Sequence, residues 1–431
     1  MPMTTTSRLK REFRRSVKRG TGRAYLLAAA HPGINFSDYL IEAAVKNYAY
    51  DGQAEPSRAH YLYQLYGISS QQPRIQRAVL QALATEQNDT WTLTQLFELT
   101  LLFAQHGDPR ARRALYHRFL RNPIAGSDWV GAYEIMALDG LEGLKHIARQ
   151  YGQALAKKAD DWHDDDLIRS FQRKHPAINA WQELLVLAEQ DQDVHRYLAT
   201  IEATRAHYAT LPRSRTEPPD LDEILRAPRP GYIGMALKKR GLDAHERRRL
   251  AEQLMSEKQT AVQEKLLYVF TLFPFPLSYE PILALAQRKP SSRNRLTEFA
   301  TRALKHLRAP TIREFALQRL LVTTRPDLYT DILLSNYQEG DAVLLTTLVS
   351  RFHNEHTLET LACSYTQLYQ ANKTPECAAP LLALYHKMTC GIHRHSVVEL
   401  LLEHQVLPAW LEEELPFDSY AETRLLYQAQ L

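Results

Sequence analysis

Apolar residues recur at the spacing of an α-helix through almost the whole of this sequence, and this periodicity limits the folds open to it. One stretch places apolar side chains at i, i+3, i+4, i+8 and i+11, on a single helical face: Leu93, Leu96, Phe97, Leu101 and Ala104. The pattern returns at 181–188 and at 262–273. The period-two alternation of a half-buried strand is not sustained anywhere. The sequence therefore predicts an all-α protein.

The predicted helices are short, because proline and glycine interrupt the pattern often. Interruptions fall at 31–33, 67–73, 106–109, 309–310 and 372–375. Glycine is nevertheless scarce, at 16 of 431 residues, and folds built on tight hairpins or phosphate loops need glycine for positive φ. The motifs Gly-x-x-x-x-Gly-Lys and Gly-x-Gly-x-x-Gly are absent. These observations argue against all-β folds and nucleotide-binding α/β folds.

Three of the interruptions share a local pattern, which starts at Pro73, Pro109 and Pro310. A small or branched apolar residue follows the proline by two positions, with a basic residue soon after and an alanine beyond it, as in Ile312, Arg313 and Ala316. This resembles the second helix of HEAT repeats, whose usual form is Asp-Pro-x-Val-Arg-x-x-Ala. The resemblance implies a HEAT- or armadillo-type α-solenoid, a right-handed superhelix of stacked antiparallel helix pairs with roughly eight to ten repeats. An irregular helical bundle is the alternative.

A proline-rich segment divides the helical pattern in two. Residues 211–231 hold many prolines and charges but few apolar side chains, which predicts a loop or linker. We therefore expect a basic N-terminal helix or extension at 1–23, an N-terminal helical-repeat array at 24–210 and a C-terminal array at 232–431. A surface loop within one continuous superhelix is the alternative.

The N-terminus is the strongest candidate for a binding surface. A single acidic residue, Glu12, stands among eight basic ones: Arg8, Lys10, Arg11, Arg14, Arg15, Lys18, Arg19 and Arg23. Leu9, Phe13 and Val17 give a helix here one narrow apolar stripe and leave the rest basic. Such a helix can lie along a phosphate backbone. The alternative is a terminal helix that caps the first repeat while its charges stay in water.

Two clusters contain residue types that bind metals. Residues 160–166 carry five aspartates, but the glycine and glutamate of an EF-hand cannot be placed there. Aspartate also suits the start of a helix near Leu167. The C-terminal region holds several cysteines and histidines without the usual Cys-x2-Cys or His-x3-5-His pairings: His353, His356, Cys363, Cys377, Cys390, His393 and His395. We therefore predict no metal and no cofactor, and expect structural histidines and buried thiols.

One short segment resembles an enzyme family. The sequence around Trp91 is similar to the Trp-Asp-x-Val-Asp motif of HEAT-like alkylpurine DNA glycosylases, which are α-solenoids. Thr92 and Gln95 stand where that family has aspartates, and an amide cannot replace a catalytic carboxylate. A Gly-x-Ser-x-Gly nucleophile elbow is absent as well. We therefore expect no enzymatic activity.

Charge and cysteine content indicate a class of partner and a location. A net charge of +4 is mild for a nucleic-acid binder. Three cysteines make a disulfide framework improbable and suit a reducing compartment. We find neither a signal peptide nor an apolar run that spans a membrane. We expect a cytoplasmic, non-catalytic scaffold or adaptor that binds a protein on the concave surface of a solenoid, with nucleic-acid binding through the basic N-terminal helix as the alternative.

Overall fold

The structure, a computed structural model, is helical in every part that it describes. The described residues are 5–121, 124, 126–158, 161–210, 220–226 and 230–428. Within them the regular secondary structure consists of α-helices and short 3-10 helices, with no strand. The prediction of an all-α protein is confirmed. None of the helices in these ranges combines the length and apolar character that crossing a bilayer requires.

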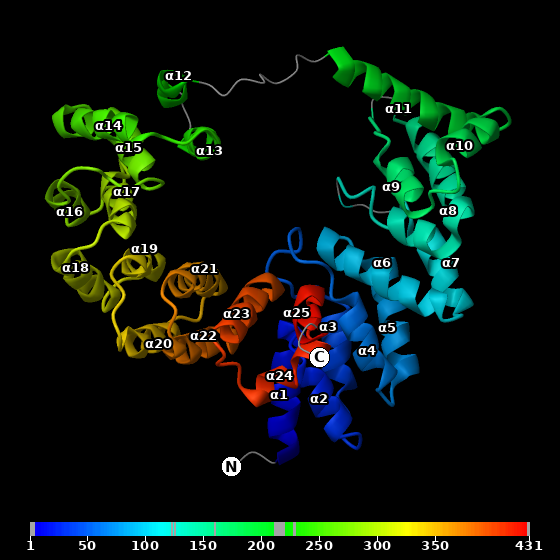
Figure 1. Ribbon diagram of the computed structural model, residues 1–431. Coiled ribbons are helices and arrows are strands. Elements are labelled where there is room, and N and C mark those ends of the chain that lie inside the picture. Colours follow the sequence, from blue (N-terminus) through cyan, green and yellow to red (C-terminus); the bar gives the residue numbers. More distant parts are fainter. Residues whose placement is uncertain are drawn as a thin grey trace. The chain divides into compact units, whose positions relative to one another are not determined.

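The chain forms two compact units, which are coloured along the sequence in Figure 1. The first unit comprises Met1–Arg213 and Trp410–Leu431. Its helices are α1 (Thr5–Arg19), α2 (Arg23–Ala30), α3 (Ser37–Ala44), α4 (Ala59–Gly67), α5 (Gln72–Thr85), α6 (Thr90–Gln105), α7 (Pro109–Arg118), α8 (Ala132–Leu155), α9 (Asp166–Lys174), α10 (Ala180–Ala188) and α11 (Gln192–Thr210). The C-terminal part adds α24 (Ala409–Glu412), η4 (Leu415–Phe417) and α25 (Ala421–Gln428).

Helices in the first unit begin where polar side chains cap them. The carboxylate of Asp89 accepts hydrogen bonds from two backbone N–H groups in the first turn of α6. Asp108 does the same for Arg110 at the start of α7, whose first residue is Pro109. Both arrangements satisfy backbone donors that a helix start leaves free. The predicted interruption at 106–109 therefore ends one helix and starts the next.

Packing in the first unit follows the order of the chain. The helix α3 contacts α4 and α5, α5 contacts α6 and α7, and α6 contacts α7 and α8. The apolar stripe predicted on α6 supplies buried side chains, among them Leu93, Leu96 and Phe97. The core of this unit therefore continues from each helix to the next one along the chain.

The last residues of the chain return to its beginning and complete the first unit (Figure 1). A backbone hydrogen bond joins the turn after α1 to the turn before α25. The rings of Tyr25 and Phe417 stack with 4.1 Å between their centroids. A Cβ atom on Gly22 would lie 1.9 Å from the carbonyl oxygen of Glu414, so this close approach requires glycine. The C-terminal segment therefore covers part of α1 and α2.

The second unit comprises Ser214–Ala409. Its helices are α12 (Leu221–Arg226), α13 (Pro230–Arg240), α14 (Ala244–Ser256), α15 (Thr260–Phe270), α16 (Glu280–Ala286), α17 (Leu296–Ala303), η1 (Leu304–His306), α18 (Pro310–Leu320), α19 (Pro326–Thr330), η2 (Asp331–Leu334), α20 (Asp341–Arg351), α21 (Glu355–Ala371), η3 (Pro375–Cys377), α22 (Ala378–Tyr385) and α23 (Gly391–Glu403).

Packing in the second unit also joins near neighbours in the sequence. The helix α15 contacts α17, α17 contacts α19, α19 contacts α21, and α21 contacts α23. The proline pattern noted at 310 starts α18, and its arginine, Arg313, makes two 2.6 Å contacts with Asp341 at the first residue of α20. This largely buried ion pair ties α18 to the start of α20.

The proline-rich segment 211–231 lies partly outside the described residues, at 211–219 and 227–229. Between those stretches the chain forms α12, where the carboxylate of Asp220 accepts a hydrogen bond from the backbone N–H of Glu223. The helix α13 begins at Pro230, which suits a first helical position because the missing N–H would be unpaired there.

Candidate functional site

The basic N-terminal helix is packed against the core of the first unit. Phe13 and Val17, two members of its predicted stripe, are each 1% exposed, and Leu9 packs partly against the same core. These contacts place α1 beside α2 and α3. The opposite face of α1 keeps its basic side chains at the surface.

Three of the eight predicted binding residues are ion-paired within the chain. Arg14 and Lys18 both contact Glu42, at 2.8 and 2.5 Å. These hydrogen bonds, the one from Arg14 above all, lower the pKa of Glu42 to about 2. Arg23 pairs with Glu12 at 2.7 Å. These cations are therefore partly neutralised before any partner arrives.

Four other side chains of the set, Arg8, Lys10, Arg11 and Arg15, make no ion pair with a carboxylate of the described residues. Arg8, Arg11 and Arg15 are exposed, and Lys10 is half-buried. In these four residues the positive charge of the predicted surface is not offset by a carboxylate of the described residues.

A pocket with aromatic walls lies between α8, α9 and α11 of the first unit. The helix α8 contacts both α9 and α11. It encloses about 540 Å³. Trp129, Tyr133 and Trp162 line it and are exposed by 39%, 37% and 63%. Large apolar rings at such exposure are unusual on a protein surface without a partner. The pocket is therefore a candidate binding site.

Two buried tyrosines support the aromatic pocket from below. Tyr151 donates a hydrogen bond to the backbone oxygen of Asp128 at 3.1 Å. Its ring lies 4.5 Å from that of His163 and 5.6 Å from that of Tyr197, measured between centroids. Burial lowers the pKa of His163 although aspartates lie nearby. The imidazole is therefore neutral at pH 7 and adds no positive charge to the pocket.

The charge of the aromatic pocket is negative. Asp165 and Asp166 pair with arginines of α9 and α11. By contrast, the carboxylates of Asp128, Asp161 and Asp164, which line the pocket, have no basic partner within 4 Å among the described residues. Aromatic faces and unpaired carboxylates both attract cations. The arrangement suits a positively charged ligand.

The sequence pattern indicates only part of this pocket. The acidic cluster at 160–166 belongs to that part, and one of its residues, Asp160, lies outside the described residues. Trp129 and Tyr133 were missed because about thirty residues separate them from the cluster. The signal available in the sequence was Trp162, a large aromatic residue in the middle of an acidic run, which is an unfavourable place for it unless it has a partner.

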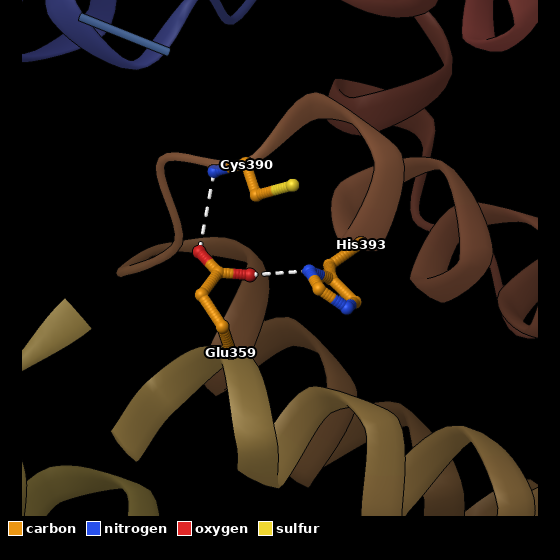
Figure 2. Close-up of side chains that lie close together, drawn as sticks. All are labelled: Glu359, Cys390 and His393. Carbon is orange, nitrogen blue, oxygen red and sulfur yellow. Dashed lines mark hydrogen bonds and ion pairs between the residues drawn. The ribbon is translucent and has the colours of Figure 1, made fainter. Parts of the chain in front are cut away.

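A second cluster, in the second unit, brings together Glu359 of α21, Cys390, which directly precedes α23, and His393 of α23 (Figure 2). One ligand atom from each lies within 4.8 Å of the others. His393 Nδ1 is 2.7 Å from Glu359 Oε2, and its Nε2 is 3.1 Å from the sulfur of Cys363. Contacts with Cys363, Cys390 and Glu359, in that order, raise the pKa of His393 well above its usual range. We call these three residues, Glu359, Cys390 and His393, the Glu-Cys-His cluster.

The segment that resembles a glycosylase motif has a structural role. Gln95 is fully buried, and its side-chain amide donates to the carbonyl oxygens of Ala43 and Ala44 at 3.1 Å each. The hydroxyl of Thr92 accepts a hydrogen bond from the backbone N–H of Asn47 at 3.0 Å. These contacts fasten α6 to the end of α3, and neither residue lines the aromatic pocket.

Comparison with known proteins adds little. No known family model matches the chain, and no curated protein matches it. An engineered protein of known crystal structure aligns over 99% of this chain and 95% of its own length, with 14% sequence identity and a TM-score of 0.19. A TM-score this low carries no argument about fold or function. The resemblance to HEAT and armadillo repeats stays a prediction.

Proposed function

We propose that this protein is a non-catalytic scaffold or adaptor that binds a protein partner through an arginine side chain held in the aromatic pocket. The observation that carries the proposal is the pocket itself, where Trp129, Tyr133 and Trp162 stand beside three carboxylates that have no basic partner among the described residues. The carboxylates are those of Asp128, Asp161 and Asp164.

The chemistry of the pocket favours a cationic side chain over other ligands. A cation over an aromatic face contributes about 0.5–2 kcal/mol, more when water is excluded. Guanidinium is planar and weakly hydrated, so it can stack on a ring and pair with carboxylates at the same time. The protein already uses this contact internally, because the guanidinium of Arg205 lies 4.4 Å from the ring centre of Trp181. A volume of about 540 Å³ is within the range of small-ligand sites and accommodates one long side chain.

We also propose that the helices stack as a HEAT-like, right-handed solenoid of antiparallel pairs with a concave partner-binding surface. The order of contacts within each unit supports this, since a solenoid joins each helix mainly to near neighbours in sequence. A recurring link supports it too. An arginine of one helix pairs with an aspartate at the start of another at Arg313–Asp341 and at Arg149–Asp191.

We propose that the protein performs this function in the cytoplasm. Cys363, Cys377 and Cys390 are free thiols. A reducing compartment keeps thiols in this state.

A second candidate function is nucleic-acid binding by α1. The observation that favours it is the set of four basic side chains without an internal ion pair, Arg8, Lys10, Arg11 and Arg15. Four cations on a helix neutralise too few phosphates for tight binding at physiological salt. We therefore rank this function below protein binding.

The test uses full-length protein and two synthetic nonapeptides with a Gly-Ser background. One carries a single central arginine and the other a citrulline, which has nearly the same shape without the charge. Calorimetric titration is expected to show binding of the arginine peptide that is about tenfold or more tighter than that of the citrulline peptide.

Pocket variants decide where the arginine binds. Trp162→Ala and Asp161→Asn are each expected to weaken binding of the arginine peptide several-fold. The matched controls are Tyr208→Ala and Glu142→Gln, which change an exposed aromatic and an exposed acidic side chain outside the pocket. The proposal fails if the citrulline peptide binds equally well, or if the pocket variants bind like the controls.

A further inference from the structure

The Glu-Cys-His cluster lies outside the aromatic pocket and serves no part of the function proposed above. Its residues come from two helices in contact. Glu359 lies in the second turn of α21. Cys390 directly precedes α23 and His393 lies in its first turn, at a Cys-x2-His spacing. Figure 2 shows the three side chains converging from these two elements.

The residue types match a zinc site. Thiolate, imidazole and carboxylate are the groups that bind Zn²⁺, at bond lengths of about 2.0–2.3 Å. Four ligands at these lengths around a tetrahedral ion stand roughly 3.2–3.8 Å apart. In the structure the three ligand atoms lie within 4.8 Å of one another, and His393 Nδ1 is 2.7 Å from Glu359 Oε2. Adjustments of about an ångström bring the set to that geometry.

Burial supplies an independent observation. The side chain of Glu359 is 3% exposed and Cys390 is 2% exposed. Glu359 Oε2 and His393 Nδ1 are both buried and lie 2.7 Å from each other, and neither atom has a further hydrogen-bond partner among the described residues. A buried carboxylate without full hydrogen bonding is costly, and a bound cation removes that cost. A cation bound here would contact both atoms in place of their contact with each other.

The surrounding groups hold the ligands in place. The second oxygen of Glu359 accepts a hydrogen bond from the backbone N–H of Cys390 at 3.2 Å. The other ring nitrogen of His393 contacts the sulfur of Cys363, one helical turn after Glu359 on α21. A histidine that binds a metal through one nitrogen usually donates a hydrogen bond through the other. Cys363 therefore orients the ring and is not itself a ligand.

We propose that Glu359, Cys390 and His393, the last through Nδ1, bind one zinc ion whose fourth position is filled by water. Calcium and magnesium are excluded by the thiolate, because both take oxygen ligands. The ion would clamp α21 to the start of α23 and so stabilise the end of the second unit. Sequence patterns do not reveal this site, because the spacing from Glu359 to Cys390 fits no common zinc motif.

The experiment uses full-length protein that has been reduced, treated with chelator and dialysed against metal-free buffer. Equilibrium dialysis against Zn²⁺ with elemental analysis is expected to give one ion per chain. Loading with Zn²⁺ is expected to raise the melting temperature, because the ion binds only the folded site. With Co²⁺, a thiolate-to-cobalt charge-transfer band in the near ultraviolet is expected.

Variants assign the ligands. Cys390→Ser is expected to abolish the charge-transfer band, and Glu359→Gln and His393→Gln to weaken Zn²⁺ binding at least tenfold. Cys363→Ala is expected to weaken binding while leaving the band intensity per bound cobalt unchanged. Cys377→Ala, which changes a buried thiol outside the cluster, is the control and is expected to bind like the parent protein. Circular dichroism identifies any variant that fails to fold, and Glu359→Gln and His393→Gln then each test the proposal separately.

Three results would overturn the proposal. One is less than a tenth of an ion per chain at saturating Zn²⁺. Another is a binding constant unchanged in folded Cys390→Ser and Glu359→Gln proteins, which would mean an adventitious surface ion only. The third is a charge-transfer band that disappears with Cys363→Ala and survives Cys390→Ser.

Discussion

At the scale of single residues, two glutamates, one buried and one partly buried, show how the surroundings set the charge of a side chain. Burial raises the pKa of Glu414 to about 7, and Arg23 offsets this only in part. Burial would also raise the pKa of Glu298, but hydrogen bonds from Arg295 and Arg302 lower it to about 2. At pH 7 the same side chain is thus about half-protonated in one place and fully ionised in the other.

Glu414 makes stability depend on pH. Its folded-state pKa of about 7 lies above the ordinary value of 4.5, so its contribution is greatest below pH 4.5 and is lost as the pH rises to about 7. Glu414→Gln, which mimics the neutral acid, is expected to raise the free energy of unfolding at pH 8 by about 1–3 kcal/mol and to leave it unchanged at pH 4.5. Urea unfolding at both pH values measures this. Glu413→Gln, at the exposed neighbour, is the control, and a loss of stability for Glu414→Gln at pH 8 would contradict the prediction.

At the scale of elements, the first unit depends on a close contact between the start of α2 and η4. The backbone of Glu414 approaches Gly22 so closely that a Cβ atom has no room. The atom it would meet belongs to the backbone, which cannot rotate away as a side chain can. This contact therefore positions the C-terminal segment against the N-terminal helices.

Replacing Gly22 tests that contact. Gly22→Ala is expected to lower the free energy of unfolding of the first unit by about 1–3 kcal/mol, because an inserted methyl group must displace backbone. Hydrogen exchange is expected to speed up in α25. At Gly33 a Cβ atom would have nothing within 4 Å, so Gly33→Ala is the matched control and is expected to change stability by less than about 1 kcal/mol. Equal effects of the two substitutions would show that the C-terminal segment is not held there.

At the scale of the whole molecule, the distribution of charge separates the candidate functions. The net charge is +4, while carboxylates line the aromatic pocket and unpaired cations gather on α1. A cationic partner and an anionic partner would therefore bind to different surfaces. Salt titration distinguishes them, since phosphate contacts release counterions.

Nucleic-acid binding is expected to be weak. Full-length protein should bind labelled duplex DNA or RNA only at low salt, with a slope of log K against log salt of about −3 to −4, as four phosphate contacts imply. Replacing Arg8, Lys10, Arg11 and Arg15 by glutamine is expected to remove this binding and leave binding of the arginine peptide intact. Submicromolar binding at physiological salt that those replacements abolish would instead establish nucleic acid as the ligand.

The sequence by itself determined that this chain is helical and where many of its helices begin. The signals that show this are local: a periodicity of 3.6 residues, proline at first helical positions and aspartate caps. Each can be recognised within ten to twenty residues of sequence. The stripe of Leu93, Leu96 and Phe97 is therefore buried as predicted, and α7 and α18 begin at the predicted prolines. The stripe of α1 is likewise buried at Phe13 and Val17.

Only the tertiary structure decided which distant residues meet. Trp129 joins Trp162 in one pocket, Glu359 meets Cys390 and His393, and the C-terminal segment lies against Gly22. None of these contacts produces a periodic pattern in the sequence, because each depends on how neighbouring helices pack and on the paths of the turns between them. Local patterns fix the helices, and packing between helices creates the sites.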